Sequence, residues 1–264
     1  MRLKIRHKTE YAYDAPVAYA LQRLRLYPRS SAVQKVDSWT IGIEGAREQV
    51  RFVDHLGNDT RLVSVEGEPH TIVLTAEGEV ETFGRDGVSG PHRGFAPLWL
   101  FLRETGLTGA GPRVEALIGG LQGGEALDRL HRLMAAIGER VAYTLGATDA
   151  QTSAEEALAN GSGVCQDHAH IFIAAARRMG FPARYVSGYL KLDDTDEQAA
   201  SHAWAEAHVD HLGWVAFDCS NGISPDERYV RLAVGCDYRD AMPISGIRHG
   251  SAEERLAVRI TVEQ

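Results

Sequence analysis

The first eighty residues alternate apolar and polar side chains with a period of two. At the start, Leu3 and Ile5 alternate with basic residues. Turns that contain glycine separate four later runs of the same kind, over residues 38–43, 48–54, 60–67 and 70–82. Such short alternating runs predict antiparallel strands, and their spacing is typical of a β-sandwich or an open barrel.

A stretch rich in glycine and proline, residues 84–94, follows this β pattern. Because that composition favours loops over packed elements, the stretch is the best candidate for a domain boundary. We therefore predict a β-rich N-terminal domain over residues 1–88 and a second domain over residues 89–264.

Helical periodicity begins after this boundary. Residues 125–141 place leucine, methionine and isoleucine side chains on one face, which predicts an amphipathic helix. Ser153 and Glu156 form the capping-box pattern that opens another helix. A third helix is predicted from Cys165 to about Met179, and because it is apolar on nearly all sides we expect it to be buried.

Strand-like runs return after the third helix, over residues 183–190, 202–209, 213–218, 229–235 and 255–262. The whole pattern predicts an α+β protein. Its N-terminal antiparallel β-sandwich domain precedes a core in which the third helix packs on an antiparallel sheet.

The sequence around Cys165 is the strongest indication of chemistry in this chain. Cys165 follows Gly161-Ser-Gly-Val and opens the apolar helix. At the first turn of a helix, unpaired backbone N–H groups and the positive end of the helix dipole both favour thiolate over thiol. The alternative is a small buried thiol, which suits Cys219 and Cys236 better. Cys165 is therefore a candidate nucleophile.

Two residues downstream supply the partners that a thiol nucleophile needs. His202 opens one strand-like run and Asp218 closes the next. A histidine can act as general base, and an acid can orient it. The two side chains share a sheet face only if the loop between the strands has an odd length or a bulge intervenes. Gly213 suits a loop of three residues at 210–212 or of five at 208–212, and we predict one of these.

Composition narrows the classes of protein. The 264 residues are 44% hydrophobic, which is enough for a sizeable core, and the net charge of −8 argues against nucleic-acid binding. Three cysteines exclude a disulfide framework and suit a reducing cytosol. The basic start lacks the apolar centre of a signal peptide, and no run approaches the length of a membrane span. We expect a cytoplasmic protein with no membrane or nucleic-acid partner.

Three segments in order, GVCQD at 163–167, HAW at 202–204 and FD at 217–218, resemble the bacterial transglutaminase-like superfamily, whose members are often described as cysteine proteases. The resemblance implies a papain-like, transglutaminase-like core with the catalytic cysteine at a helix N-terminus. It implies Cys165 as nucleophile, His202 as general base and then acid, and Asp218 as the residue that fixes the imidazole tautomer. The first eighty residues resemble the β-rich domain that accompanies this core in many members.

This sequence departs from the superfamily pattern at two positions. Cys219 stands where relatives usually have proline, and it places a second thiol beside the triad. His168 stands where relatives tend to have an aromatic residue, one helical turn from the nucleophile, where it could touch the site. Neither departure removes a member of the triad.

The expected reaction is acyl transfer on an amide bond through a thioester, most simply hydrolysis by a protease or amidase acting on a peptide or protein. Alternatives are a protein-glutamine transglutaminase, which uses an amine acceptor, and a non-catalytic binding module. Gln166, Trp204 and Trp214 are candidate substrate contacts, together with residues 238–240. We expect no cofactor. A zinc site is a further alternative, although the spacing matches no tight metal motif; its candidate ligands are Cys165, His168, His170, His202 and His208.

Overall fold

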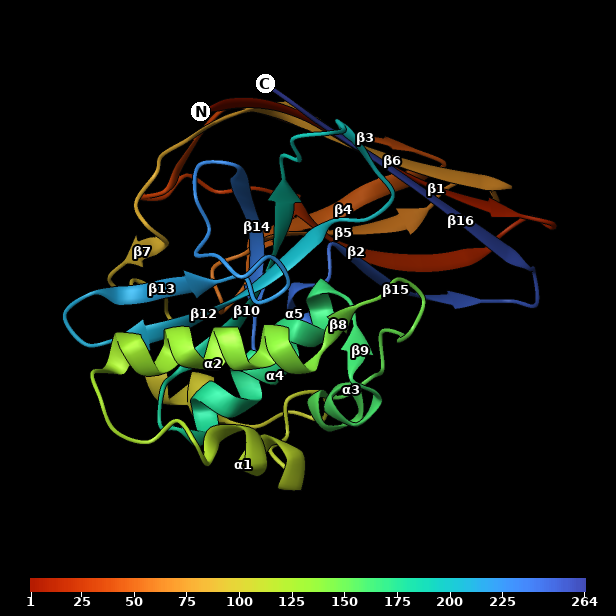
Figure 1. Cartoon of the computed structure of the whole chain (residues 1–264). Coiled ribbons are helices and arrows are strands. Elements are labelled where there is room, and N and C mark those ends of the chain that lie inside the picture. Colours follow the sequence, from red (N-terminus) through yellow and green to blue (C-terminus); the bar gives the residue numbers. More distant parts are fainter.

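The computed structural model describes all residues from 1 to 264. Two antiparallel sheets form one half of the molecule, at the top of Figure 1. The five-stranded sheet has the order β11 (Glu197–Gln198), β16 (Glu254–Glu263), β1 (Arg2–Tyr13), β6 (Thr71–Thr82) and β3 (Gln34–Glu44). The four-stranded sheet has the order β15 (Ile244–His249), β2 (Tyr19–Tyr27), β5 (Asp59–Val65) and β4 (Ala46–Val53). The predicted sandwich is confirmed.

Alternation along the strands builds the core of the sandwich. Leu3 and Ile5 of β1 are buried while their basic neighbours are exposed, and Leu74 of β6 and Leu24 of β2 are fully enclosed. Each such side chain contributes about 1.5–3 kcal/mol when it leaves water. The period-two pattern therefore selects one inner face for each sheet.

The last two strands belong to the sandwich and not to the second half of the molecule. β16 pairs with β1 over ten residue pairs, and β15 pairs with β2. The prediction grouped residues 244–263 with the second domain because they follow it in sequence. The structure instead uses them to cover edges of the N-terminal sheets, where unpaired N–H and C=O groups would otherwise stay exposed.

A second five-stranded sheet and a set of helices form the other half (Figure 1). Its strand order is β14 (Tyr229–Gly235), β10 (Ala183–Leu190), β12 (His202–Val209), β13 (Gly213–Phe217) and β7 (Val88–Gly90). The helices are η1 (Leu98–Leu102), α1 (Pro112–Ile118), α2 (Ala126–Arg140), α3 (Ala154–Asn160), α4 (Cys165–Arg178) and α5 (Tyr238–Ala241). Two short parallel strands, β8 (Ala142–Tyr143) and β9 (Ser162–Gly163), precede α3 and α4 respectively.

Helix α4 is the centre of this half. Its residues 171–176 have no exposed surface, and it packs against β12, whose inward residues Ala203, Ala205 and Ala207 are small. Helices α1, α2 and α3 cover its other sides. The predicted buried helix and the capping box of Ser153 at the start of α3 are both confirmed. No helix of the structure is both long and apolar enough to cross a membrane.

Side-chain amides join the two halves at strand β14. The Gln34 amide accepts a hydrogen bond from the Arg231 N–H (2.7 Å) and donates one to the Arg231 carbonyl oxygen (2.8 Å). Asn58 does the same for Val234, at 2.8 Å in both directions. β14 is an edge strand, and these two amides bond backbone groups that a further strand would otherwise bond. Residues of the sandwich therefore cover the edge of the second sheet.

We expect Gln34→Ala to lower the free energy of unfolding by about 1–3 kcal/mol, because it leaves the Arg231 backbone groups without partners at the interface. Urea unfolding measures this loss. Gln49→Ala is the matched control, since its amide bonds Ser64 on the exposed surface of the sandwich, and such changes stay within about 0.5 kcal/mol. Equal effects of the two substitutions would contradict the role given to Gln34.

Candidate active site

Cys165 is the first residue of α4, and a carboxylate fixes the turn that leads into it. Asp167 accepts hydrogen bonds from the Val164 N–H (2.7 Å) and the Thr148 hydroxyl (2.6 Å). Gly163 allows this turn, because a Cβ at that position would lie 2.7 Å from the Asp167 side chain. The local sequence therefore sets both the start of the helix and the place of the thiol.

The position of Cys165 gives it two advantages as a nucleophile. It is partly accessible, whereas Cys219 and Cys236 are buried. As the first helical residue, it has a backbone N–H with no carbonyl partner within the helix. This free N–H and the positive end of α4 favour negative charge beside the thiol.

His202 and Asp218 meet on one face of the sheet. Val209 of β12 pairs with Gly213 of β13, so the loop between the strands contains three residues, and Gly213 has a φ of 83°. An odd loop places the two side chains on the same side, and His202 Nε2 lies 2.6 Å from Asp218 Oδ2. Of the two predicted loop lengths, three and five residues, the structure has three, so the prediction of an odd loop is confirmed.

Asp218 is held by several donors besides His202. Its carboxylate accepts hydrogen bonds from the Ser220 N–H (3.0 Å) and hydroxyl (2.7 Å), from the Asn221 side-chain amide (2.8 Å) and from the Tyr229 hydroxyl (2.8 Å). Burial alone would raise the pKa of Asp218, but the hydrogen bonds from His202, Ser220 and Asn221 hold it well below its usual range. The carboxylate therefore stays ionised beside the imidazole.

The imidazole of His202 is stabilised in its charged form. Burial opposes the charge, but the hydrogen bond to Asp218 and the interactions with Cys165 raise the pKa of His202 to about 10. Because Nε2 faces Asp218, Nδ1 is the ring nitrogen left for the thiol. This arrangement can hold a thiolate and an imidazolium side by side, which is the resting form of an activated cysteine.

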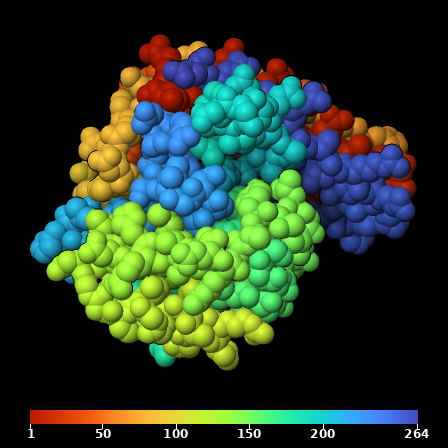
Figure 2. Space-filling model, viewed as in Figure 1, coloured from red at the N-terminus to blue at the C-terminus, as the bar shows by residue number.

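A cleft of about 760 Å³ opens over these groups. Cys165, Gln166 and His202 line it, and Tyr143 and Leu145 form an exposed apolar rim. One wall is the segment 191–201, which β11 ties to β16 of the sandwich. Figure 2 shows this teal segment lying against the sandwich, above the blue segment that follows β13.

Two of the residues predicted as substrate contacts, Trp204 and Trp214, do not line the cleft. Trp214 pairs with His208, six residues from His202 along β12, which is a distance of about 20 Å at ~3.3 Å per residue. It is buried, and the Arg184 guanidinium lies 3.9 Å from its ring centroid. Trp204 stacks on His202 at 6.3 Å between ring centroids and does not line the cleft. Gln166 and Tyr238 do line it.

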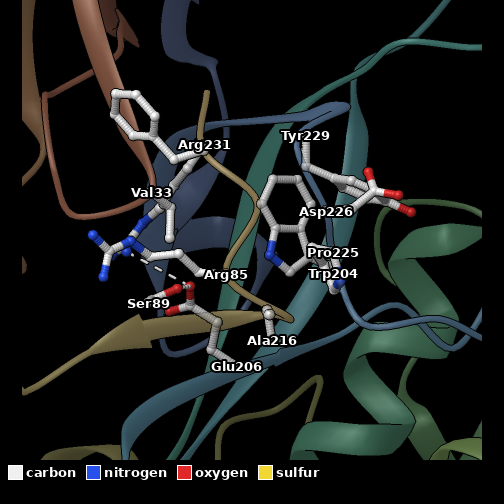
Figure 3. Close-up of a pocket in the computed structure, with 12 residues that line it drawn as sticks. Val33, Arg85, Ser89, Trp204, Glu206, Ala216, Pro225, Asp226, Tyr229 and Arg231 are labelled. Carbon is white, nitrogen blue, oxygen red and sulfur yellow. Dashed lines mark hydrogen bonds and ion pairs between the residues drawn. The ribbon is translucent and has the colours of Figure 1, made fainter. Parts of the chain in front are cut away.

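Trp204 and Tyr229 hold the candidate triad from behind, because Trp204 stacks on His202 and Tyr229 bonds Asp218. Trp204 and Tyr229 pack edge to face at 5.4 Å and line a small pocket against the end of the sandwich (Figure 3). Glu206 lies deeper in it, paired with Arg184 and Arg231. Sequence reasoning missed Tyr229, because a tyrosine that opens a strand carries no local signal of its partner eleven residues away.

The histidines near Cys165 do not form a metal site. His168 places Nδ1 2.9 Å from the Val164 carbonyl oxygen and Nε2 3.0 Å from that of Val141, so it ties the start of α4 to the end of α2 and does not line the cleft. His170 accepts a hydrogen bond from the Tyr238 N–H (3.2 Å). No three His, Cys, Asp or Glu side chains gather in a way that could hold a metal ion.

Comparison with known proteins places this geometry in a family. Residues 115–219 match the transglutaminase-like superfamily, and residues 3–81 match the bacterial transglutaminase-like N-terminal region. An uncharacterized protein of Mycobacterium leprae is 30% identical over 99% of this chain and 98% of its own length. The chain belongs to the transglutaminase-like superfamily. An uncharacterized protein of Mycobacterium tuberculosis is 29% identical over 97% of this chain and 90% of its own length.

A solved structure shares the fold of this transglutaminase-like chain. It is described as a "Putative Cysteine Protease from Cytophaga hutchinsonii", has a TM-score of 0.77 and 22% identity, and the match covers 100% of this chain and 91% of that one. The family supports cysteine-based catalysis in general, and this neighbour shows that the fold is shared.

The raised pKa of His202 predicts how stability depends on pH. A histidine whose folded pKa lies near 10 adds stability that is fully present below its unfolded value of about 6.5 and is lost as the pH rises through 10. The difference in unfolding free energy between the native chain and His202→Gln should therefore shrink from pH 6.5 to 10.5, measured by urea unfolding. His208→Gln is the control. Because burial lowers the pKa of His208, the difference in unfolding free energy between the native chain and His208→Gln should change below pH 6.5 and not above it. A His202→Gln difference that is constant above pH 6.5 would contradict the assignment.

Proposed function

We propose that this transglutaminase-like chain is a cysteine peptidase or amidase that hydrolyses amide bonds with Cys165, His202 and Asp218. The observation that carries the proposal is the 2.6 Å hydrogen bond between His202 and Asp218 at the cleft that exposes Cys165. A pure binding module has no need of an ionised carboxylate, an imidazole and a helix-start thiol at one place.

In the first step, the Cys165 thiolate attacks the carbonyl carbon of the substrate. The Cys165 N–H at the start of α4 stabilises the oxyanion that forms. When the tetrahedral adduct collapses, the His202 imidazolium gives its proton to the departing amine, and a thioester remains. Asp218 keeps Nε2 of the imidazole occupied, so that Nδ1 faces the reacting atoms.

In the second step, His202 takes a proton from water, and the resulting hydroxide attacks the thioester. The acid is released and the thiolate returns. A primary amine could take the place of water, and the product would then be a new amide. Adding a primary amine during turnover therefore separates hydrolysis from transamidation by the product formed.

The cleft suits a peptide or protein substrate in an extended conformation. Its volume lies in the range of about 300–1,000 Å³ that is typical of ligand sites. Apolar side chains at the rim, Tyr143 and Leu145, offer contact area for side chains on either side of the cleaved bond. Charge does not dominate the cleft, since Glu197 is its only acidic side chain.

Cysteine labelling tests whether the thiolate and imidazolium pair exists. At pH 6, iodoacetamide should label Cys165 at least ~10-fold faster than an ordinary thiol of pKa ~8.5. In His202→Ala this advantage should disappear, and the pH dependence should move towards that of an ordinary thiol. Peptide mass spectrometry follows each cysteine separately. Cys219 and Cys236 are buried, so they serve as negative controls within the same sample.

His208→Ala is the matched control, because His208 lies on the same face of β12 but does not line the cleft. It should leave the labelling profile of Cys165 unchanged. If native Cys165 labels only with the profile of an ordinary thiol, the proposal fails and the binding-module alternative gains support.

A further inference from the structure

Tyr185 is a buried tyrosine whose hydroxyl has no partner in the protein. Tyr185 is the third residue of β10, is 2% exposed and lines the cleft together with Cys165. Two other largely buried tyrosines have partners: the Tyr189 hydroxyl lies 3.0 Å from His7 Nδ1, and the Tyr229 hydroxyl donates to Asp218. Because buried hydroxyls are normally hydrogen-bonded, the exception at Tyr185 calls for a partner that comes from outside.

Tyr185 lines the cleft, and its hydroxyl is not fully enclosed. The hydroxyl is absent from the set of fully enclosed polar atoms that lack a partner, so its oxygen keeps some contact with solvent. The ring itself belongs to the hydrophobic core around α4, against which Cys165 and Tyr238 also pack. The polar tip of a core side chain therefore faces the space beside the nucleophile.

Neighbouring rings fix the orientation of Tyr185. The His170 ring lies 5.3 Å from it, centroid to centroid, and the Tyr238 ring lies 6.0 Å from it in an edge-to-face arrangement. His170 accepts the Tyr238 N–H, which joins the two supporting residues to each other. A hydrogen-bond donor held in this way needs no reorganisation during a reaction, which is the condition for effective oxyanion stabilisation.

The charge states around Tyr185 keep it a donor. Burial raises the pKa of Tyr185 well above its usual value, and Cys165, Tyr238, Asp167 and Asp237 raise it further. Burial also lowers the pKa of His170 to about 4, so that ring is neutral at working pH. The phenol therefore keeps its proton at neutral pH.

We propose that the Tyr185 hydroxyl is the second oxyanion donor, beside the backbone N–H of Cys165. This inference rests on the proposed function. As the thiolate forms its bond to the carbonyl carbon, the π electron pair moves onto the carbonyl oxygen, which accepts hydrogen bonds from both donors. No proton is transferred from Tyr185, and the pair returns to the carbonyl when the amine leaves with the proton of His202.

The other two tyrosines of the cleft fit this role less well. The Tyr143 side chain is 53% exposed, so water competes for its hydroxyl. Tyr238 is only partly buried and lies on α5, a helix of four residues. Of these three tyrosines, Tyr185 combines an enclosed ring, a strand paired on both sides and an unpartnered hydroxyl.

Two reagents separate this role from that of the nucleophile. Acylation of Cys165 by p-nitrophenyl acetate passes through an oxyanion, whereas alkylation by iodoacetamide displaces iodide at a saturated carbon and forms none. We expect Tyr185→Phe to slow acylation about 100-fold, the usual effect of removing one oxyanion donor. Alkylation should change less than about twofold, because in this proposal Tyr185 does not activate the thiol.

Tyr189→Phe is the matched control, since it removes the hydroxyl of another buried tyrosine on β10 that contacts His7 and not the cleft. Its acylation and alkylation rates should both equal those of the native chain. A second variant retains the ring and its hydroxyl: 3-fluorotyrosine at position 185 is a stronger hydrogen-bond donor and should raise the ratio of acylation to alkylation.

Each result decides the question. Native-like acylation in Tyr185→Phe with normal alkylation overturns the role of Tyr185 and leaves the proposed function intact. An equal loss of both rates in Tyr185→Phe, or no change in ratio with 3-fluorotyrosine, shows a structural role and also overturns it. If Cys165 of the native chain reacts with neither reagent faster than an ordinary thiol, the proposed function fails and this inference fails with it.

Discussion

The burial of α4 from Asp167 to Arg177 is the constraint on which the second half of the molecule depends. A helix that is apolar on nearly every side must be enclosed, so a sheet covers one side and three helices cover the others. Enclosure leaves only the first turn of the helix facing the cleft, and that turn carries Cys165. The alanines of β12 let the sheet approach closely, which brings the strand that begins with His202 next to the same turn. Packing therefore brings the imidazole to the turn in which Asp167 and Gly163 hold the thiol.

Local sequence was enough to predict the features that depend on neighbouring residues. The start of α4, the capping box at Ser153 and the odd loop before Gly213 each follow from a few adjacent positions and from the periods of helix and strand. The odd loop mattered most, because its length decides whether the side chains of Asp218 and His202 lie on the same face of the sheet.

Features that depend on distant parts of the chain were not predictable in this way. Nothing near Tyr229 shows that its hydroxyl reaches Asp218, and nothing near Tyr185 shows that its hydroxyl lacks a partner. Trp204 and Trp214 have the composition of a binding wall, but an indole can equally fill a core, and only the register of β12 with β13 distinguishes the two. Strands β15 and β16 carry ordinary alternation, which does not say which sheet they join. Their pairing is a property of the assembled fold.

The pairing of β16 with β1 has a consequence for how the chain is made. The ribosome releases β1 before β16, and the whole second half of the molecule lies between them in sequence, so the strand that lies beside β1 in the finished sheet is made only after that half. Until then, one edge of β1 is free to pair with another chain. The sandwich is thus begun before the second half of the molecule and completed after it, unlike the usual order in which one domain folds on its own before the next is translated. A chain that stops before β16 would keep that edge of β1 uncovered.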